Sequence, residues 1–213
     1  MQQFSEEMLR LNEVDQKVVG LAMAIMKADS GKFYSLDFLV LAALNRSKLN
    51  IHGFRNLIEL GNYFAATPFV RMQLDSALRL FATTLVRNPN ELAQKILDGE
   101  SISKLKDRSG SKMRDAYLLS EFAKTEPWVT KVYESGSGFI HLSNKHIIGL
   151  FSGSGESGEV QIAIGSTQDS IPEPFRIEAV AAITHITQLI LNLCNRWLNE
   201  KNAHSSGVPN SAP

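Results

Sequence analysis

The stretch from Pro68 to Val86 constrains the fold of this chain more than any other. Its sequence, PFVRMQLDSALRLFATTLV, places apolar residues on nearly every side of a helix, which is typical of a helix buried by its neighbours. Arg71, Asp75 and Arg79 recur at four-residue spacing, so they share one face of that helix. Charges in a buried helix need partners, because desolvating an unpaired charge is costly. This helix therefore predicts either an internal row of ion pairs or a polar cleft.

The composition is that of an ordinary globular protein. Of 213 residues, 44% are hydrophobic and 21% are charged, and the chain is long enough to bury a sizeable core. The 22 basic and 22 acidic residues cancel, so the net charge does not indicate a strongly charged partner such as duplex DNA. The single cysteine, Cys194, excludes an internal disulfide and fits a reducing compartment. Its apolar setting, LILNLCNRW, favours a packed thiol over a nucleophile.

Neither end of the chain predicts membrane targeting. The segment Met1–Gln16 is polar and charged, unlike a signal peptide. The least charged window, Ala179–Asn195, contains Thr, His, Gln and Asn and is shorter than the roughly 20 apolar residues of a membrane span. We therefore expect a cytoplasmic protein without membrane contact.

Hydrophobic periodicity and capping signals predict a mainly α fold, a bundle of six to seven helices with one β-hairpin before the C-terminal helix. The hairpin is expected at about residues 147–166, where IIGLF and VQIAIGS flank a Gly- and Ser-rich turn. Residues 1–201 are expected to form a single helical domain, followed by a disordered tail at 202–213. The expected helices are Ser5–Asp29, Leu36–Leu60, Pro68–Val86, Asn90–Leu97, about Lys112–Lys124, a segment starting at Pro127, and Phe175–Lys201.

The C-terminal helix carries two stripes. Its apolar positions alternate steps of four and three, which predicts a bundle seam: Ala179, Ile183, Ile186, Ile190, Leu193 and Trp197. Opposite this seam lies an uncharged polar stripe, which suits a half-buried dimer surface or the wall of a cleft: His185, Gln188, Asn192 and Asn195.

Two groups of residues are candidates for ligand binding. Arg71, Asp75 and Arg79 could hold a phosphate or carboxylate, because a guanidinium fork matches such oxygens in pairs; the alternative is a structural ion-pair network. Tyr133, Ser137 and His141 fall on one side if their segment is helical, and could transfer protons or activate a hydroxyl. The alternative for that set is a histidine hydrogen-bonded across a helix contact.

Other patterns give weaker indications. His141 and His146 are five residues apart, off the spacing that puts two metal ligands on one helical face, and we expect neither a metal nor a cofactor. The loop from Ser101 to Asp115 holds five cationic side chains and could bind phosphates or RNA, or could simply be solvated. The glycine runs SGSG and SGSGESG lack the ending of a phosphate-binding loop and are read as turns.

Three segments resemble known proteins: RMQLDSALRLFA, VYESGSGFIHLS and NRSKLNIHGF. They are similar to segments of uncharacterised bacterial helical proteins, which are loosely similar to abortive-infection-type and HEPN-like families, over about residues 36–146. The resemblance implies a helical fold and no established activity. In HEPN-type ribonucleases an arginine and a histidine cleave RNA in a dimer cleft, and Arg46 and His52 would match that motif. On an unbroken helix these two side chains point roughly 120° apart.

The leading hypothesis is a cytoplasmic helical protein that binds a small anionic ligand or a protein partner in a polar cleft, with a homodimer as a candidate assembly. The cleft is expected between the central helix, at Arg71, Asp75 and Arg79, and the segment holding Tyr133, Ser137 and His141. The alternative is a metal-independent HEPN-like ribonuclease of a defence or toxin system that uses Arg46 and His52, with RNA as its partner.

Overall fold

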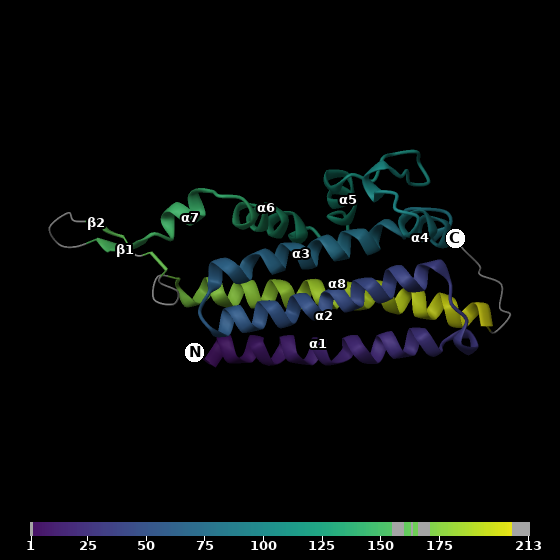
Figure 1. Ribbon diagram of the computed structural model, residues 1–213, viewed down its shortest axis with the longest axis horizontal. Helices are drawn as coiled ribbons and strands as arrows, with labels where there is room; N and C mark the ends of the chain where they lie inside the picture. The colour runs from purple at the N-terminus through teal and green to yellow at the C-terminus, as the bar shows by residue number, and fades with distance from the viewer. Residues whose placement is uncertain (1, 155–159, 163, 166–170, 206–213) are drawn as a thin grey trace.

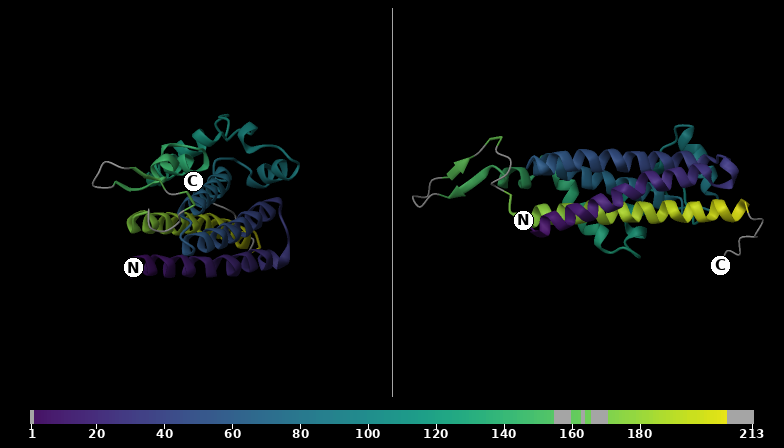
Figure 2. Two further views of the ribbon diagram at one scale, coloured as in Figure 1. Left: turned by 60° about the vertical axis from the view of Figure 1, so that its left-hand side comes forward. Right: turned by 90° about the horizontal axis from the view of Figure 1, so that it is seen from below.

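Four long helices lying side by side form the frame of the computed structural model, which describes residues 2–154, 160–162, 164–165 and 171–205 (Figure 1). They are α1 (Gln2–Lys27), α2 (Ser35–Glu59), α3 (Tyr63–Ala82) and α8 (Glu173–Ser205). Helices α1, α3 and α8 run in one direction and α2 runs in the other (Figures 1 and 2). The prediction of a mainly α helical bundle is confirmed, but the described residues form eight α-helices instead of the expected six to seven.

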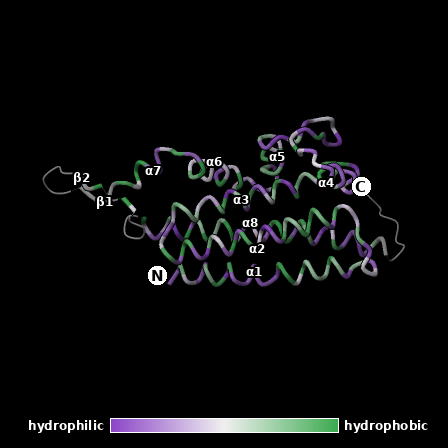
Figure 3. The backbone as a smooth tube through the Cα atoms, in the orientation of Figure 1, coloured by the Kyte–Doolittle hydropathy of each residue, from purple (hydrophilic) through white to green (hydrophobic). Residues whose placement is uncertain are grey.

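The long helices are amphipathic, and hydrophobic and hydrophilic residues alternate along each of them (Figure 3). In α1 the buried residues Leu11, Val14, Val18, Leu21 and Ile25 recur at steps of three and four. The seam predicted for the last helix is also present. Ala179, Ile183, Ile186, Ile190 and Trp197 are buried, while Leu193 is half-buried beside the buried Cys194.

Helix α3 occupies the centre of the fold. It packs against α2 and α8 on one side and against α5 (Asp115–Phe122) and α6 (Trp128–Ile140) on the other. Its predicted start at Pro68 is wrong, because the helix begins at Tyr63. The Asn62 side chain caps this start by accepting a hydrogen bond from the Ala65 N–H. Pro68 lies inside the helix and has no N–H to donate to the Phe64 carbonyl. The Thr67 hydroxyl donates to that carbonyl instead.

A buried polar cluster joins the middle of three helices. The Gln73 amide of α3 donates to the hydroxyls of Ser47 and Thr187, on α2 and α8, and its oxygen accepts from Asn50, 3.1 Å away. All four side chains are buried and satisfied. Such a cluster favours one register of the helices, since any shift would leave buried polar groups unpaired.

A second buried polar group closes the C-terminal end of α8. The Lys201 ammonium donates to a carboxylate oxygen of Asp37 and to the Ile25 carbonyl, at 2.8 and 2.9 Å. The same carboxylate accepts from the indole N–H of Trp197 at 2.8 Å and from the backbone N–H of Tyr34 at 2.7 Å. Both charged side chains are fully buried.

The segment between α3 and α8 covers the outer side of α3 (Figure 1). It holds α4 (Pro89–Leu97), α5, α6 and α7 (Asn144–Ile148), and a 3₁₀ turn at Ile102–Lys104; another 3₁₀ turn, Asp29–Gly31, links α1 to α2. This long excursion returns the chain to the end where α3 begins. Helix α8 can therefore run parallel to α3.

The hairpin expected at about 147–166 is not supported in those bounds. Residues 147 and 148 belong to α7, and residues 155–159, 163 and 166 lie outside the described part of the chain. What the structure has are two fragments, β1 (Phe151–Ser154) and β2 (Val160–Ile162), paired antiparallel with an irregularity between Phe151 and Gly153. The two paired fragments lie beyond the end of the four-helix bundle (Figure 1).

Other expected boundaries shift as well. The helix expected at about Lys112–Lys124 is α5, Asp115–Phe122. Helix α8 continues to Ser205, so residues 202–205 of the expected disordered tail are helical, and the rest of that tail lies outside the described residues. Within Glu173–Ala203 this helix has the length and mean hydropathy of a membrane span, and half of the apolar window is buried in the bundle.

Candidate functional site

The charged row predicted on the central helix forms ion pairs rather than an open cleft. The Asp75 carboxylate lies between two guanidinium groups, 2.9 Å from Arg46 and 3.1 Å from Arg79. Arg79 also binds Asp115 at the start of α5, at 2.6 Å. These side chains link α2, α3 and α5 through half-buried ion pairs. The arrangement therefore matches the structural alternative for Asp75 and Arg79.

Arg71 stands apart from this row. It is 8% exposed, its guanidinium carbon lies 3.9 Å from the centroid of the Tyr133 ring, and its Nε makes no hydrogen bond. Gly136 makes room for it, since a Cβ at that position would lie 3.0 Å from the Arg71 Cβ. The predicted juxtaposition of Arg71 and Tyr133 is thus present as a cation–π contact between α3 and α6.

The other two residues of the second group do not join Arg71. The Ser137 hydroxyl donates to the Tyr133 carbonyl at 2.8 Å, inside α6. His141 follows the last residue of α6, in extended backbone, and is exposed. The helix that would have placed Tyr133, Ser137 and His141 on one side ends one residue too early.

Arg46 and His52 take different partners on α2. The Arg46 guanidinium binds Asp75, whereas the exposed His52 ring lies 3.4 Å from the Asn56 amide one turn further along. Their different partners agree with a separation of roughly 120° between the two side chains around a regular helix.

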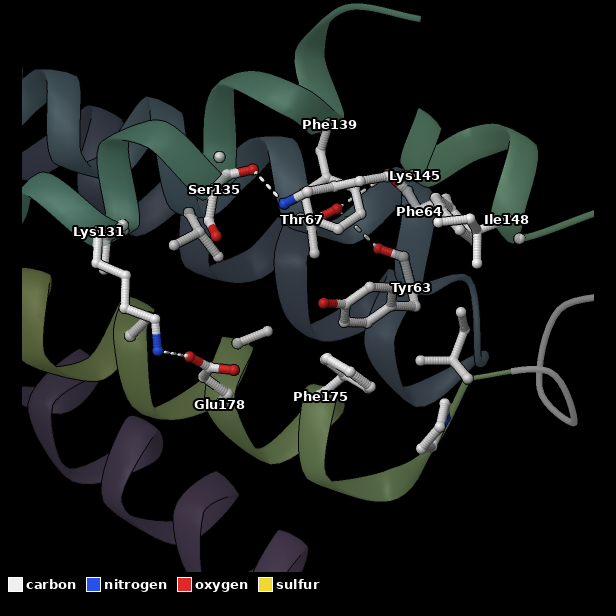
Figure 4. A pocket seen from close by; sticks show the side chains of 18 residues that line it. Tyr63, Phe64, Thr67, Lys131, Ser135, Phe139, Lys145, Ile148, Phe175 and Glu178 are labelled. Atoms are coloured by element: carbon white, nitrogen blue, oxygen red, sulfur yellow. Dashed lines mark hydrogen bonds and ion pairs between the residues drawn. The ribbon is translucent and has the colours of Figure 1, made fainter. Parts of the chain in front are cut away.

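The candidate site lies next to the contact between Arg71 and Tyr133, towards the start of α3. There, a cavity of about 530 Å³ opens between the first turns of α3, helices α6 and α7, and the start of α8 (Figure 4). This volume falls within the range of roughly 300–1,000 Å³ that is typical of small-molecule sites. Most of the lining is apolar, and its principal members are Tyr63, Phe64, Val70, Val132, Phe139, Ile148, Phe175 and Ala182.

Three aromatic rings form the wall beneath α6 and α7. Tyr63 and Phe64 of α3 each lie within 6 Å of the Phe139 ring, measured between centroids at 5.6 and 5.9 Å. His146 of α7 lies 5.6 Å from Phe64, and its Nδ1 accepts from the Ser143 N–H. These ring contacts hold α7 against α3. They fix the wall of the cavity in place.

Lys145 supplies a positive charge at the edge of this apolar cavity. Its ammonium donates to the Ser135 carbonyl at 2.8 Å and lies 4.3 Å from the Phe139 centroid (Figure 4). Among the described residues, no carboxylate lies within ion-pair distance of it. Desolvation lowers the pKa of Lys145, and the charge of Glu178 opposes that shift in part. An anion in the cavity would meet a cation that has no carboxylate bound to it.

Two further polar groups face the cavity. The Tyr63 hydroxyl points into it (Figure 4), and burial, aided by the charge of Glu178, raises the pKa of Tyr63 to about 12. This hydroxyl therefore keeps its proton and can donate a hydrogen bond to a ligand. At the opposite rim Lys131 binds Glu178 at 3.1 Å, so these two charges neutralise each other.

A second hollow of about 600 Å³ continues along α6 and α8. It shares Lys131, Val132, Glu178 and Ala182 with the first cavity and is also lined by Trp128, His185 and Gln188. The His185 and Trp128 rings lie 6.1 Å apart. Two members of the polar stripe predicted on the last helix thus line a cleft wall.

The loop that holds five cations is closed by a backbone bridge and by hydrogen bonds to one carboxylate. Its bridge pairs Lys106 with Lys112, and the Asp107 carboxylate accepts from Ser109, from the Ser111 N–H and from the Tyr117 hydroxyl. Desolvation raises the pKa of Asp107, but the hydrogen bonds from Tyr117, Ser109 and Ser111 outweigh it and bring the pKa to about 2.

Across the described ranges no group of three or more His, Cys, Asp or Glu side chains could hold a metal ion. Cys194 is buried, and desolvation raises the pKa of its thiol to about 12, which suits packing rather than nucleophilic chemistry.

The sequence reasoning missed Tyr63, Lys145 and the rest of the cavity. One signal was available: residues 139–151, FIHLSNKHIIGLF, are largely apolar, carry one lysine and contain no acidic residue. Comparison with known proteins adds no further candidate, since no protein-family model, curated protein or solved structure matches this chain.

Proposed function

We propose that this protein binds a small amphipathic anion, with its apolar body in the cavity between α3, α6, α7 and α8 and its anionic group at Lys145. The proposal keeps the small anionic ligand that the sequence led us to expect. It places this ligand in the cavity beside Lys145 instead of at Arg71, Asp75 and Arg79. The observation that carries it is the Lys145 ammonium, which binds no carboxylate among the described residues and lies at the edge of an apolar cavity of about 530 Å³.

The chemistry of the lining favours this ligand class. Apolar walls stabilise a hydrocarbon or ring body by burial, at about 25 cal/mol per Å² of apolar surface removed from water. A carboxylate, sulfate or phosphate group would accept hydrogen bonds from the Lys145 ammonium and from the Tyr63 hydroxyl, both of which are donors. A ligand without charge would leave the partly desolvated ammonium without a new partner, and a cationic one would be repelled.

The test compares dodecanoate with dodecanol, which share a chain and differ in charge, below the concentrations at which either aggregates. Calorimetry and thermal shift should detect dodecanoate, because a ligand at 100 times its dissociation constant adds about 2.7 kcal/mol, or roughly 5–10 °C in Tm at this chain length. Lys145→Met keeps the aliphatic stem and removes the charge. We expect it to weaken dodecanoate about tenfold and to leave dodecanol unchanged.

Two further variants separate the site from general effects. Lys104→Met removes an exposed lysine on the distant loop and should bind both compounds like the wild type. Ala182→Phe, which fills the cavity, should abolish binding of both, with circular dichroism as the check on folding. If neither compound binds the wild type, or if Lys145→Met keeps the wild-type preference for the carboxylate, the proposal is wrong.

The ribonuclease alternative rests on the resemblance alone. Among the described residues no observation brings Arg46 and His52 into one site, and both have other contacts. RNA that stays intact with pure protein, or cleavage that survives His52→Ala, would remove it.

A further inference from the structure

Large apolar side chains are exposed around the end of the molecule where α6 finishes. Leu142 is 89% exposed and Ile164 is 90% exposed, and the neighbouring residues of α7, the strands and the start of α8 are exposed to 40% or more. We call this set the apolar tip: Ile140, Leu142, Ile147, Ile148, Leu150, Ile162, Ile164 and Phe175. Exposed apolar residues that gather in this way mark an interaction surface, whereas single ones need no explanation.

The apolar tip is not a single flat stripe. Ile147 and Ile148 are consecutive in α7, so their side chains leave the helix about 100° apart, yet both are more than half exposed. The strands that hold Ile162 extend past the end of the bundle, as two directions of view agree (Figures 1 and 2). A protein partner with a flat surface would cover one side of such a projection. A lipid bilayer would surround it.

Lys145 is the one cationic residue that the sequence places among the residues of the apolar tip. Residues 139–151 contain Lys145, His141 and His146 and no acidic residue, whereas residues 152–175 contain four acidic residues and no Lys or Arg. Of the nearby acidic residues that the structure describes, Glu178 is bound to Lys131 and Glu173 also has an interaction. A lysine with an apolar segment beside it can keep its ammonium among headgroups while its stem lies deeper.

The apolar tip is also continuous with the candidate site. Ile148 and Phe175 belong to the tip and line the cavity, so the opening of the cavity lies beside the surface that would meet the lipid. An amphipathic molecule dissolved in a bilayer could pass into the cavity without crossing water.

We propose that the apolar tip inserts into the interfacial region of a lipid bilayer while the four-helix bundle stays outside. This is peripheral attachment by a projecting apolar end, not a membrane span. The sequence-based expectation of no membrane contact considered a signal peptide and spanning segments, but not peripheral attachment. The proposal stands on the exposed residues of the tip and does not require that the cavity be filled.

The experiment is flotation of the full chain with vesicles of phosphatidylcholine, alone or mixed with phosphatidylglycerol. The tip variant combines Leu142→Gln, Ile147→Gln and Ile164→Gln. A matched control combines Leu9→Gln, Leu49→Gln and Leu97→Gln, which are 61%, 60% and 51% exposed elsewhere. All six positions are more than half exposed, so neither variant removes a core residue.

We expect the wild type and the control to float with both kinds of vesicle, because apolar side chains rather than net charge would hold the tip in the bilayer. Full transfer of one such side chain from water to hydrocarbon is worth about a tenfold change in partition, so the tip variant should bind at least about tenfold more weakly. In a second measurement, Leu142→Trp should gain a blue-shifted emission on vesicle addition that the wild type lacks.

Three outcomes would overturn the inference. The wild type could fail to float, or the tip variant could float as well as the control. Light scattering could instead show that the wild type is a dimer and the tip variant a monomer, in which case a second copy of the chain covers the tip. Loss of dodecanoate binding in Lys145→Met does not bear on any of these, so the ligand proposal and the membrane proposal can fail separately.

Discussion

The buried pair of Asp37 and Lys201 should be the most sensitive polar contact in the fold, and Asp37→Asn tests it. The substitution keeps the size of the side chain but removes the carboxylate that binds the fully buried Lys201 ammonium. Loss of one partner of a buried pair typically costs about 3–5 kcal/mol. Because Lys201 keeps its hydrogen bond to the Ile25 carbonyl, we expect a cost near the lower end, about 3 kcal/mol.

The reverse change should cost less. In Lys201→Met the Asp37 carboxylate keeps two donors, the Trp197 indole and the Tyr34 backbone N–H, so we expect about 1–3 kcal/mol. The double variant should cost less than the sum of the two, because it leaves no buried charge without its partner.

Urea unfolding followed by circular dichroism measures each change in free energy, and a loss of 3 kcal/mol should lower Tm by roughly 6–12 °C. Lys95→Met is the control, since Lys95 binds Glu91 at 2.7 Å on the surface and such pairs are worth about 0–1 kcal/mol. If Asp37→Asn costs no more than Lys95→Met, or if the double variant is strictly additive, the reasoning about this buried pair is refuted.

Three further predictions concern other parts of the molecule. Gly53→Ala should lower the free energy of unfolding in urea by about 1–3 kcal/mol, because the new Cβ would lie 2.7 Å from the Phe69 ring. Gly20→Ala, where no atom lies within 4 Å of the new Cβ, should raise it by about 0.4–1 kcal/mol, and equal effects of the two substitutions would contradict this. The pKa of Asp107 is lowered from 3.8 to about 2, so its contribution to stability is present above about pH 4 and lost as pH falls towards 2. The urea midpoints of the wild type and Asp107→Asn should therefore converge near pH 2, and a difference between the midpoints that does not change with pH would contradict this. Cys194 should react with iodoacetamide only in denaturant, since burial raises its pKa to about 12, and rapid labelling of the folded protein would show that it is accessible.

Periodicity predicted the helices well because it depends on local spacing. The seam of α8 was read from steps of three and four, and its members are buried as expected, apart from Leu193. The same spacing places Lys201 four residues after Trp197, on that seam. The sequence thus held a signal for a buried lysine, but its partner Asp37 lies 164 residues away and no local pattern connects them.

The partners of the predicted site residues could not be predicted, because they come from distant elements. Spacing placed Arg71, Asp75 and Arg79 on one face of α3, but it could not tell that α2 and α5 would supply Arg46 and Asp115 as partners. No local sequence pattern could predict the cavity, because its walls come from four helices, α3, α6, α7 and α8. The start of α3 was misplaced because Pro68 is common at a helix start, while here the Thr67 hydroxyl compensates for a proline inside the helix.

The distribution of polar contacts along α8 explains why the cavity lies at its N-terminal end. Near the C-terminal end of α8, Lys201 forms a buried ion pair with Asp37 of α2. In the middle of α8, the Thr187 hydroxyl accepts a hydrogen bond from Gln73 of α3. Near the start of α8, Lys131 of α6 forms an ion pair with Glu178. Both side chains are exposed, so this pair contributes little to stability. Helices α6 and α7 are held there by aromatic and apolar contacts with α3, and such contacts resist small shifts less than a satisfied buried network does. If the cavity binds the ligand proposed above, that ligand would enter at the end of α8 where apolar contacts, rather than the buried polar contacts of Thr187 and Lys201, hold the neighbouring helices.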